Sequence, residues 1–174
     1  PLYSASASLL NLAALTYRLD AQHHWEPSLT DIKAKIDEAR SQGIEPRVIV
    51  VINPGNPTGA CMTRAEVEDM IKLAHRESLA IFADEVYQDN VYNKDRPFVP
   101  FRRVLMELQN SQDASEREIG SSVELVSFHS TSKGMVGECG RRGGFFVLNN
   151  MDAEVEAQIN KVVSMSLCPP TQGQ

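Results

Sequence analysis

The stretch RVIVVINPGNPTG, residues 47–59, carries the strongest signal for the fold of this chain. Its first half is a continuous β-branched run, which is typical of a strand buried on both faces of a sheet. Its second half, NPGNPTG (53–59), is rich in the residues that form turns. The stretch therefore predicts a central strand that ends in a polar turn.

Further strands and helices alternate along the chain on both sides of this stretch. Strands are predicted at ALTYRL (14–19), LAIFADEVY (79–87), VELVSF (123–128) and GGFFVLN (143–149). Helices are predicted at residues 4–11, from Ser28 to Gly43, after the capping box of Thr63 and Glu66, around 100–110, and from near Asp152. We expect QNSQDASEREIGSS (109–122) to be a solvated loop or a partly ordered insert. The alternation predicts an α/β fold of three layers, α/β/α, with a mostly parallel sheet.

Composition limits the class of protein. The 174 residues are 42% hydrophobic and 23% charged, which predicts one globular domain with a sizeable core. A net charge of −6 argues against nucleic acid or an anionic membrane as the main partner. No apolar run approaches the roughly 20 residues of a membrane-spanning helix, so we expect a soluble protein. The cysteines Cys61, Cys139 and Cys168 form no C-x-x-C pair, which predicts free thiols in a reducing compartment, and we expect no bound metal.

Three predicted strands end in polar, turn-forming sequence. Residues 47–53 lead into NPGNPTG, the strand at 79–83 leads into Asp84 to Tyr87, and 123–128 leads into HSTSKG (129–134). In open α/β sheets, ligands bind beyond the carboxyl ends of the strands. If these strands are parallel, the three polar segments lie on one rim and form a ligand site.

Each segment by itself also has an ordinary structural interpretation. NPGNPTG is a turn-rich connector, Asp84 and Glu85 suit a solvated strand end, and adjacent arginines usually lie on a wet surface. Ser130-x-x-Lys133 also matches the nucleophile motif of penicillin-binding proteins and class A β-lactamases. That enzyme class needs S-D-N and K-T-G partners, for which QDN (88–90) is a poor substitute and no K-T-G exists. We therefore consider a serine nucleophile enzyme less well supported than a ligand site that all of these motifs form together.

Taken in order, the motifs NPGNPTG, ADEVY, STSKG and RRGG resemble those of fold-type I pyridoxal-phosphate aminotransferases, and most closely the alanine aminotransferase group. The resemblance covers nearly the whole chain and includes PLYSA at its start and LCPP near its end. Met135 stands where the group usually has an aromatic residue, and FFVLNN replaces an aromatic-Met-Glu run. These differences indicate a divergent member.

The resemblance implies a role for each rim residue. Lys133 would form the Schiff base with pyridoxal 5'-phosphate, and burial beside cationic groups would keep its amine neutral. The freed amine would then move the proton between the substrate α-carbon and the cofactor. Asp84 would pair with the pyridinium nitrogen, and Asn56 and Tyr87 would donate hydrogen bonds to the ring oxygen.

The phosphate of the cofactor would be bound by hydroxyls and one arginine. Ser130 and Ser132 supply the hydroxyls, and the R-G-G context selects Arg142 as the arginine. Arg141 stands eight residues after Lys133, the spacing of aspartate aminotransferases, and is the alternative. Glu85 has no expected contact with the cofactor.

The resemblance also implies what the whole protein does. The expected reaction is L-alanine plus 2-oxoglutarate giving pyruvate plus L-glutamate. The alternatives are another class I/II aminotransferase, a pyridoxal-phosphate β-lyase or cyclopropane-carboxylate synthase relative, and a non-catalytic aminotransferase-like binding or regulatory module. We expect amino acid and 2-oxo acid substrates, a homodimer, and a cytoplasmic location, with a mitochondrial one as the alternative.

The ends of the chain are expected to be internal to a longer protein. Residues 1–174 would form a single, partial cofactor-binding domain. The glycine loop that helps to hold the phosphate would precede Pro1, and the arginine that grips the substrate carboxylate would lie in a small domain beyond Gln174. We therefore expect this chain to hold the main cofactor site but not to suffice for activity.

Overall fold

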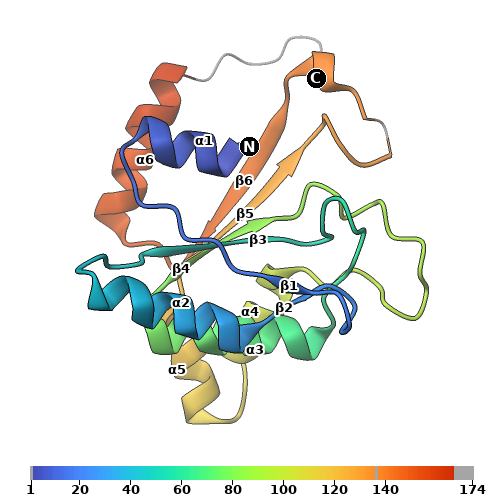
Figure 1. The fold of residues 1–174 in the computed structure, drawn as a ribbon. Helices are drawn as coiled ribbons and strands as arrows, with labels where there is room; N and C mark the ends of the chain where they lie inside the picture. The colour runs from blue at the N-terminus through green and yellow to red at the C-terminus, as the bar shows by residue number, and fades with distance from the viewer. Residues whose placement is uncertain (1, 136, 167–174) are drawn as a thin grey trace. The chain divides into compact units, whose positions relative to one another are not determined.

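The computed structural model describes residues 2–135 and 137–166 (Figure 1). The chain divides into two compact units, Pro1–Arg47 and Val48–Gln174. The LCPP motif at 167–170, with Cys168, lies outside the described residues. The residues predicted to form the rim all belong to the second unit.

The first unit contains two helices and a small hairpin. Its elements are α1 (Leu2–Leu9), β1 (Leu19–Asp20), β2 (Glu26–Pro27) and α2 (Leu29–Ser41). Helix α2 begins as predicted, because the Ser28 side chain accepts a hydrogen bond from the Asp31 amide. The predicted strand at 14–19 is wrong for all but its last residue. A strand needs a partner along its length, and β2 pairs with Leu19 and Asp20 alone.

The second unit is built on a four-stranded sheet in the order β3-β4-β5-β6. The strands are β3 (Val48–Ile52), β4 (Ala80–Asp84), β5 (Leu125–Ser130) and β6 (Gly144–Asn149). The first three are parallel, whereas β6 runs antiparallel to β5. This confirms the predicted α/β fold with a mostly parallel sheet, and it brings the carboxyl ends of β3, β4 and β5 to one rim (Figure 1).

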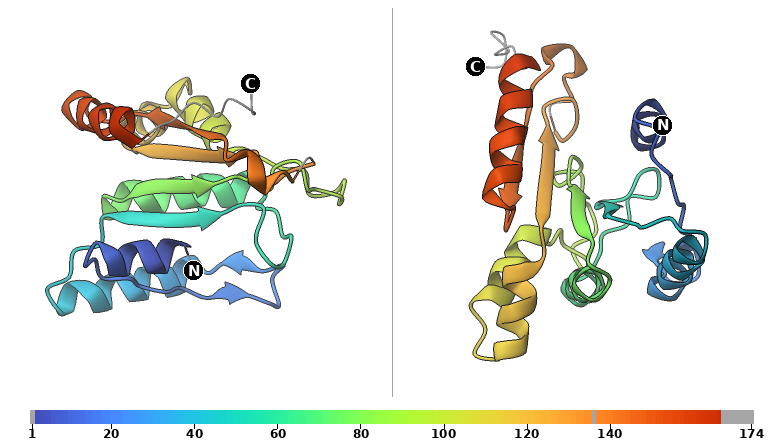
Figure 2. Two further views of the ribbon diagram at one scale, coloured as in Figure 1. Left: turned by 90° about the horizontal axis from the view of Figure 1, so that it is seen from above. Right: turned by 90° about the vertical axis from the view of Figure 1, so that its left-hand side faces the viewer.

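The second unit also contains helices, some of which pack against the sheet. They are α3 (Arg64–Glu77), α4 (Phe101–Gln109), α5 (Ala114–Ser122) and α6 (Ala153–Ser166). Helix α3 begins with the predicted capping box, in which the Glu66 amide donates to Thr63 Oγ1 and the Thr63 amide donates to Glu66 Oε2. Its predicted apolar face is buried, with Val67, Met70 and Ile71 fully covered. Helix α6 runs back beside β6 (Figure 2).

The prediction of a loop or partly ordered insert at 109–122 is wrong, because α5 occupies most of it. Asp113 caps this helix by accepting a hydrogen bond from the Ser115 amide at 2.7 Å. The buried Gly120 lets α5 approach α4 so closely that an added Cβ would lie 2.5 Å from the Gln109 nitrogen. Residues 109–122 show no apolar residues at helical spacing, so the helix was not predicted. This helix depends on close backbone packing rather than on an apolar face.

None of the helices in the described part of the chain has both the length and the apolar character that crossing a membrane would require.

Candidate cofactor site

The rim collects the ends of three strands and the start of a fourth. Asp84 is the last residue of β4, and the Asn53 amide that follows β3 donates to its carbonyl oxygen at 3.0 Å. Ser130 is the last residue of β5, and it pairs with Gly144 at the start of β6. Because β6 is antiparallel, the segment just before it, including Arg142, returns to the same rim.

Three of the predicted residues meet at this rim. The Asn56 amide Nδ2 donates a hydrogen bond to the Tyr87 hydroxyl at 3.1 Å. The Lys133 amine lies 5.7 Å from the centre of the Tyr87 ring, within the range of a cation–π contact. These residues come from the loops after β3, β4 and β5, so the contacts confirm that the polar ends of the parallel strands converge.

The loop that carries Asn56 is held by internal hydrogen bonds. Asn53 is fully buried, and its side-chain oxygen accepts a hydrogen bond from the Met62 amide at 2.9 Å. The Gly55 amide donates to the Ala60 carbonyl at 2.8 Å. The peptide bonds Asn53–Pro54 and Asn56–Pro57 are both cis. NPGNPTG is therefore an ordered support for Asn56.

The turn that carries Tyr87 also reaches the lysine loop. Gly134 follows Lys133 and has a φ of +69°, which favours glycine, and an added Cβ there would lie 3.0 Å from the Asp89 carboxylate. Nδ2 of Asn90 lies 3.5 Å from the Gly134 carbonyl oxygen, at the long limit of a hydrogen bond. Sequence reasoning missed this support, although its residues follow directly after Tyr87.

Lys133 is exposed in this chain, and the burial expected for its amine remains a prediction for the whole protein. Its side chain extends over the Tyr87 ring from a loop beyond the end of β5, rather than from the sheet itself. A residue on such a loop needs covering chain to become buried, and the motif itself carries no information on that cover.

Ser130, Ser132 and Arg142 lie on two connected segments at the end of β5. Ser130 Oγ accepts a hydrogen bond from the Ser132 amide at 3.1 Å. The Thr131 amide donates to the Gly143 carbonyl at 3.0 Å, and this bond holds the residue after Arg142 against the serine segment. Arg142 has a φ of +52°, and its Nη1 donates to the Cys139 carbonyl at 3.0 Å. The hydroxyls and the guanidinium thus come from adjoining backbone.

Arg141 differs from Arg142 in its surroundings. It ends the short 3₁₀ helix η1 (Cys139–Arg141), and its guanidinium forms an ion pair with the Glu138 carboxylate. Its charge already has an acidic partner within the loop.

Asp84 and Glu85 lie in different environments although they are neighbours. Asp84 is half-buried, and its Oδ1 lies 3.5 Å from the Val86 amide. Glu85 is 6% exposed, and its Oε1 accepts a hydrogen bond from the Phe101 amide at 2.8 Å. Burial raises the pKa of Glu85 to about 7, against the lowering effect of the Phe101 amide and the Ser127 side chain. Glu85 follows Asp84 directly, and successive side chains of a strand point to opposite faces of the sheet. This position in the sequence could therefore have predicted that Glu85 lies on the other face.

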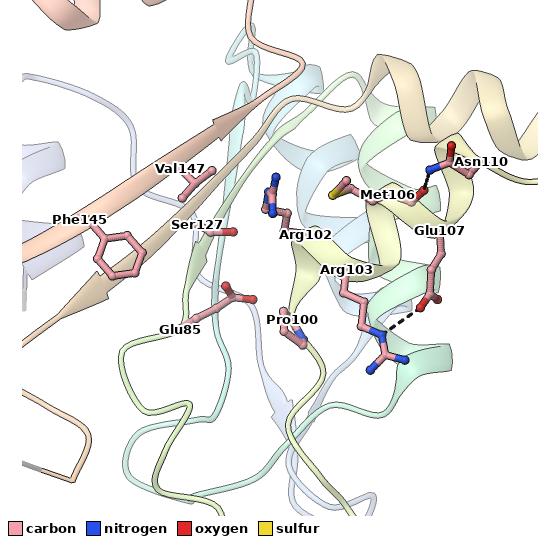
Figure 3. Close-up of a pocket in the computed structure, with 10 residues that line it drawn as sticks. All are labelled: Glu85, Pro100, Arg102, Arg103, Met106, Glu107, Asn110, Ser127, Phe145 and Val147. Atoms are coloured by element: carbon pink, nitrogen blue, oxygen red, sulfur yellow. Dashed lines mark hydrogen bonds and ion pairs between the residues drawn. The ribbon is translucent and has the colours of Figure 1, made fainter.

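A cavity of about 600 Å³ lies on that other face, between α4 and the strands (Figure 3). Its lining residues are Glu85, Pro100, Arg102, Arg103, Met106, Glu107, Asn110, Ser127, Phe145 and Val147. None of the predicted cofactor residues lines it. The cavity is therefore distinct from the rim site, and Glu85 is the residue that joins the two regions.

The side chains at the rim suit a ligand with four kinds of polar group. A primary amine can bond to an aldehyde, and a carboxylate can hold a proton on a ring nitrogen. Amide and phenol groups can donate to a ring oxygen, and hydroxyls with a guanidinium can bind a phosphate. Pyridoxal phosphate carries all four of these groups, so the residues present fit it.

Comparisons with known proteins agree with this fit. Residues 1–174 match the family described as aminotransferase class I and II. The chain is 45% identical to alanine aminotransferase 2 of Xenopus tropicalis and 42% identical to glutamate–glyoxylate aminotransferase 1 of Arabidopsis thaliana, over 174 residues in each case. These matches cover all of this chain but only 32% and 35% of the two relatives, so the chain spans about a third of their length.

A solved structure agrees in fold as well as in sequence. An aminotransferase from Escherichia coli superimposes with a TM-score of 0.75 at 30% identity, over 97% of this chain and 37% of that one. The match of the family along the whole chain, together with this fold, shows that the chain is a member of the class I and II aminotransferases.

Proposed function

We propose that this chain forms the main cofactor-binding part of a pyridoxal-phosphate-dependent alanine aminotransferase. The reaction is transfer of the amino group of L-alanine to 2-oxoglutarate, which gives pyruvate and L-glutamate. The observation that carries the proposal is the meeting of Asn56, Tyr87 and Lys133 at the rim where β4 ends in Asp84. The substrate pair is supported by the resemblance to alanine aminotransferases.

Each rim residue has a defined task in this reaction. Pyridoxal phosphate, when bound, supplies an electron-withdrawing ring that stabilises negative charge on the α-carbon of the amino acid. The Asp84 carboxylate holds a proton at the ring nitrogen, which keeps the ring electron-withdrawing. The Lys133 amine holds the cofactor covalently before the substrate arrives, and then takes the proton from the substrate α-carbon.

Asn56 and Tyr87 act together on the ring oxygen. The Tyr87 hydroxyl accepts the hydrogen bond from Asn56 Nδ2, so its own hydrogen remains available to donate onward. A hydroxyl that accepts one hydrogen bond becomes a stronger donor for the next one. This pair therefore orients the ring and stabilises negative charge on its oxygen.

The phosphate is bound at the end of β5. Ser130 and Ser132 donate from their hydroxyls, and Arg142 supplies the charged donors. The ion pair of Arg141 with Glu138 favours Arg142 for this task, because the Arg141 charge is already compensated. The whole protein is proposed to act as a cytoplasmic homodimer on amino acids and 2-oxo acids.

A second candidate is transamination between glutamate and glyoxylate. The 42% identity to the Arabidopsis enzyme of that name supports it. The two reactions differ both in the amino acid that donates the amino group and in the 2-oxo acid that accepts it. Rates measured with L-alanine plus 2-oxoglutarate and with L-glutamate plus glyoxylate separate the candidates.

The cofactor assignment is tested by absorbance of the full-length protein mixed with pyridoxal phosphate. We expect a visible band from the lysine-bound cofactor, which L-alanine converts to the shorter-wavelength pyridoxamine form. Lys133→Ala removes the only amine proposed to bond to the cofactor, so the band is lost. Lys94→Ala, at an exposed lysine in another loop, is the control and retains it.

Two results would contradict the proposal. A wild-type protein without the band does not bind the cofactor as proposed. A Lys133→Ala protein that keeps the band uses a different lysine.

A further inference from the structure

The carboxyl group of Glu85 links the rim to the start of helix α4. The N-cap residue of α4 is Pro100, whose side chain has no oxygen with which to accept a hydrogen bond from the first turn. Glu85 Oε1 takes over this task for the Phe101 amide at 2.8 Å. Phe101 is fully buried, so this end of the helix is anchored in the core.

The same residue is also held through its backbone. The Glu85 amide donates to the Phe128 carbonyl at 3.1 Å, which extends the pairing of β4 with β5 by one residue. Its carbonyl accepts from the Gln88 amide at 3.0 Å and closes the turn that contains Tyr87. Glu85 therefore stands between Asp84 and Tyr87 and binds their connecting segment to both β5 and α4.

We propose that Glu85 is a positioning residue, whose buried carboxyl group fastens the Asp84–Tyr87 segment to the first turn of α4 and so holds both side chains in place at the rim. The inference rests on the proposed function, since its importance lies in the binding of pyridoxal phosphate. Glu85 itself lines the cavity behind the sheet (Figure 3), whereas none of the residues proposed to bind the cofactor lines it.

The surroundings of Glu85 also make this link sensitive to pH. The polar groups that line the cavity with it are Ser127 on β5 and Arg102, Arg103, Glu107 and Asn110 on α4. On its own segment, the neighbouring Asp84 carboxylate acts with burial to raise the Glu85 pKa, which lies near 7. The charge of the Glu85 carboxyl group, next to Asp84, therefore changes at pH values near 7.

Hydrogen–deuterium exchange of the chain without cofactor tests the link directly. Glu85→Ala removes the acceptor of the Phe101 amide and, with it, the link of residues 85–90 to α4. We therefore expect hydrogen exchange of the Phe101 amide and of residues 85–90 to become at least tenfold faster, on the order of what local opening allows. The control is Glu77→Ala, since Glu77 is also 6% exposed but lies at the far end of α3. It should leave both regions at the wild-type rate. Unchanged exchange in Glu85→Ala would overturn the inference.

Cofactor binding by the full-length protein gives the second measurement. Glu85→Ala should weaken the binding of pyridoxal phosphate roughly tenfold, by analogy with the loss of a partner that orients a metal ligand. Glu77→Ala should bind as the wild type does. Equal affinities of the two variants would also overturn the inference. A wild type without the cofactor band would instead refute the proposed function, while the exchange result still decides the role of Glu85.

Glu85→Gln keeps the inference testable if Glu85→Ala does not fold. The glutamine amide oxygen can still accept from the Phe101 amide, so exchange should match that of the wild type. Its charge is constant, so the change in cofactor absorbance that we expect the Glu85 charge to cause near pH 7 in the wild type should be lost. A pH profile identical to that of the wild type would count against the assignment.

Discussion

Replacing Glu85 by glutamine should remove a pH dependence from the stability of the fold. The ordinary pKa of 4.5 applies to the unfolded chain, and burial raises it to about 7 in the folded protein. Between these two values the unfolded chain releases its proton first, so the free energy of unfolding falls as the pH rises. Each tenfold change in acidity corresponds to about 1.4 kcal/mol, so the total loss is about 3 kcal/mol.

The assay is denaturation by urea at pH 5 and at pH 8, at one ionic strength and without cofactor. The wild type should lose about 2.5 kcal/mol more than Glu85→Gln between the two pH values, because glutamine does not ionise and part of the total loss has already occurred at pH 5. Glu118→Gln, at an exposed position on α5, measures the effect of removing a surface carboxyl group. Equal losses in the wild type and Glu85→Gln would refute the reasoning. A wild type that gains stability at pH 8 relative to Glu85→Gln would show that the α4 N-terminus favours the ionised form.

Two further substitutions test the packing and the phosphate site. Gly120→Ala should cost about 1–3 kcal/mol in thermal denaturation, because its Cβ would lie 2.5 Å from the Gln109 nitrogen, whereas Gly140→Ala meets no atom within 4 Å and should cost less. Equal melting temperatures of the two variants would disprove the close approach. Arg142→Ala should weaken pyridoxal phosphate by about 10- to 100-fold, the value of a hydrogen bond to a charged group, and Arg141→Ala by less. A larger effect of Arg141→Ala in the same titration would assign the phosphate to Arg141.

Local sequence determined most of the helices and strands of the second unit. The β-branched run at 47–53 predicted β3, and the apolar spacing after Thr63 predicted α3 together with its capping box. Such signals act between residues within about one turn of helix or along one strand, so they can be read without the tertiary structure. The predictions for residues 14–19 and 109–122 were wrong. A strand at 14–19 depended on a pairing partner, and the structure of 109–122 depended on the packing of one helix against another.

Part of the rim site could also be predicted from the sequence. Parallel strands bring their carboxyl ends together, so the motifs at those ends predicted that the three polar segments would meet. The resemblance to aminotransferases then singled out Asn56, Tyr87 and Lys133 within these segments. This followed from the order of the elements along the chain and needed no knowledge of contacts.

Only the tertiary structure decided the direction of β6, the exposure of Lys133 and the contact of Glu85 with Phe101. The antiparallel direction of β6 returns Arg142 to the rim, and an apolar run does not encode direction. The Glu85 carboxyl and the Phe101 amide are 16 residues apart and meet because α4 packs against the sheet at β5. Sequence thus determined which groups the site contains, whereas packing between distant segments determined how those groups are held and how far each is exposed to water.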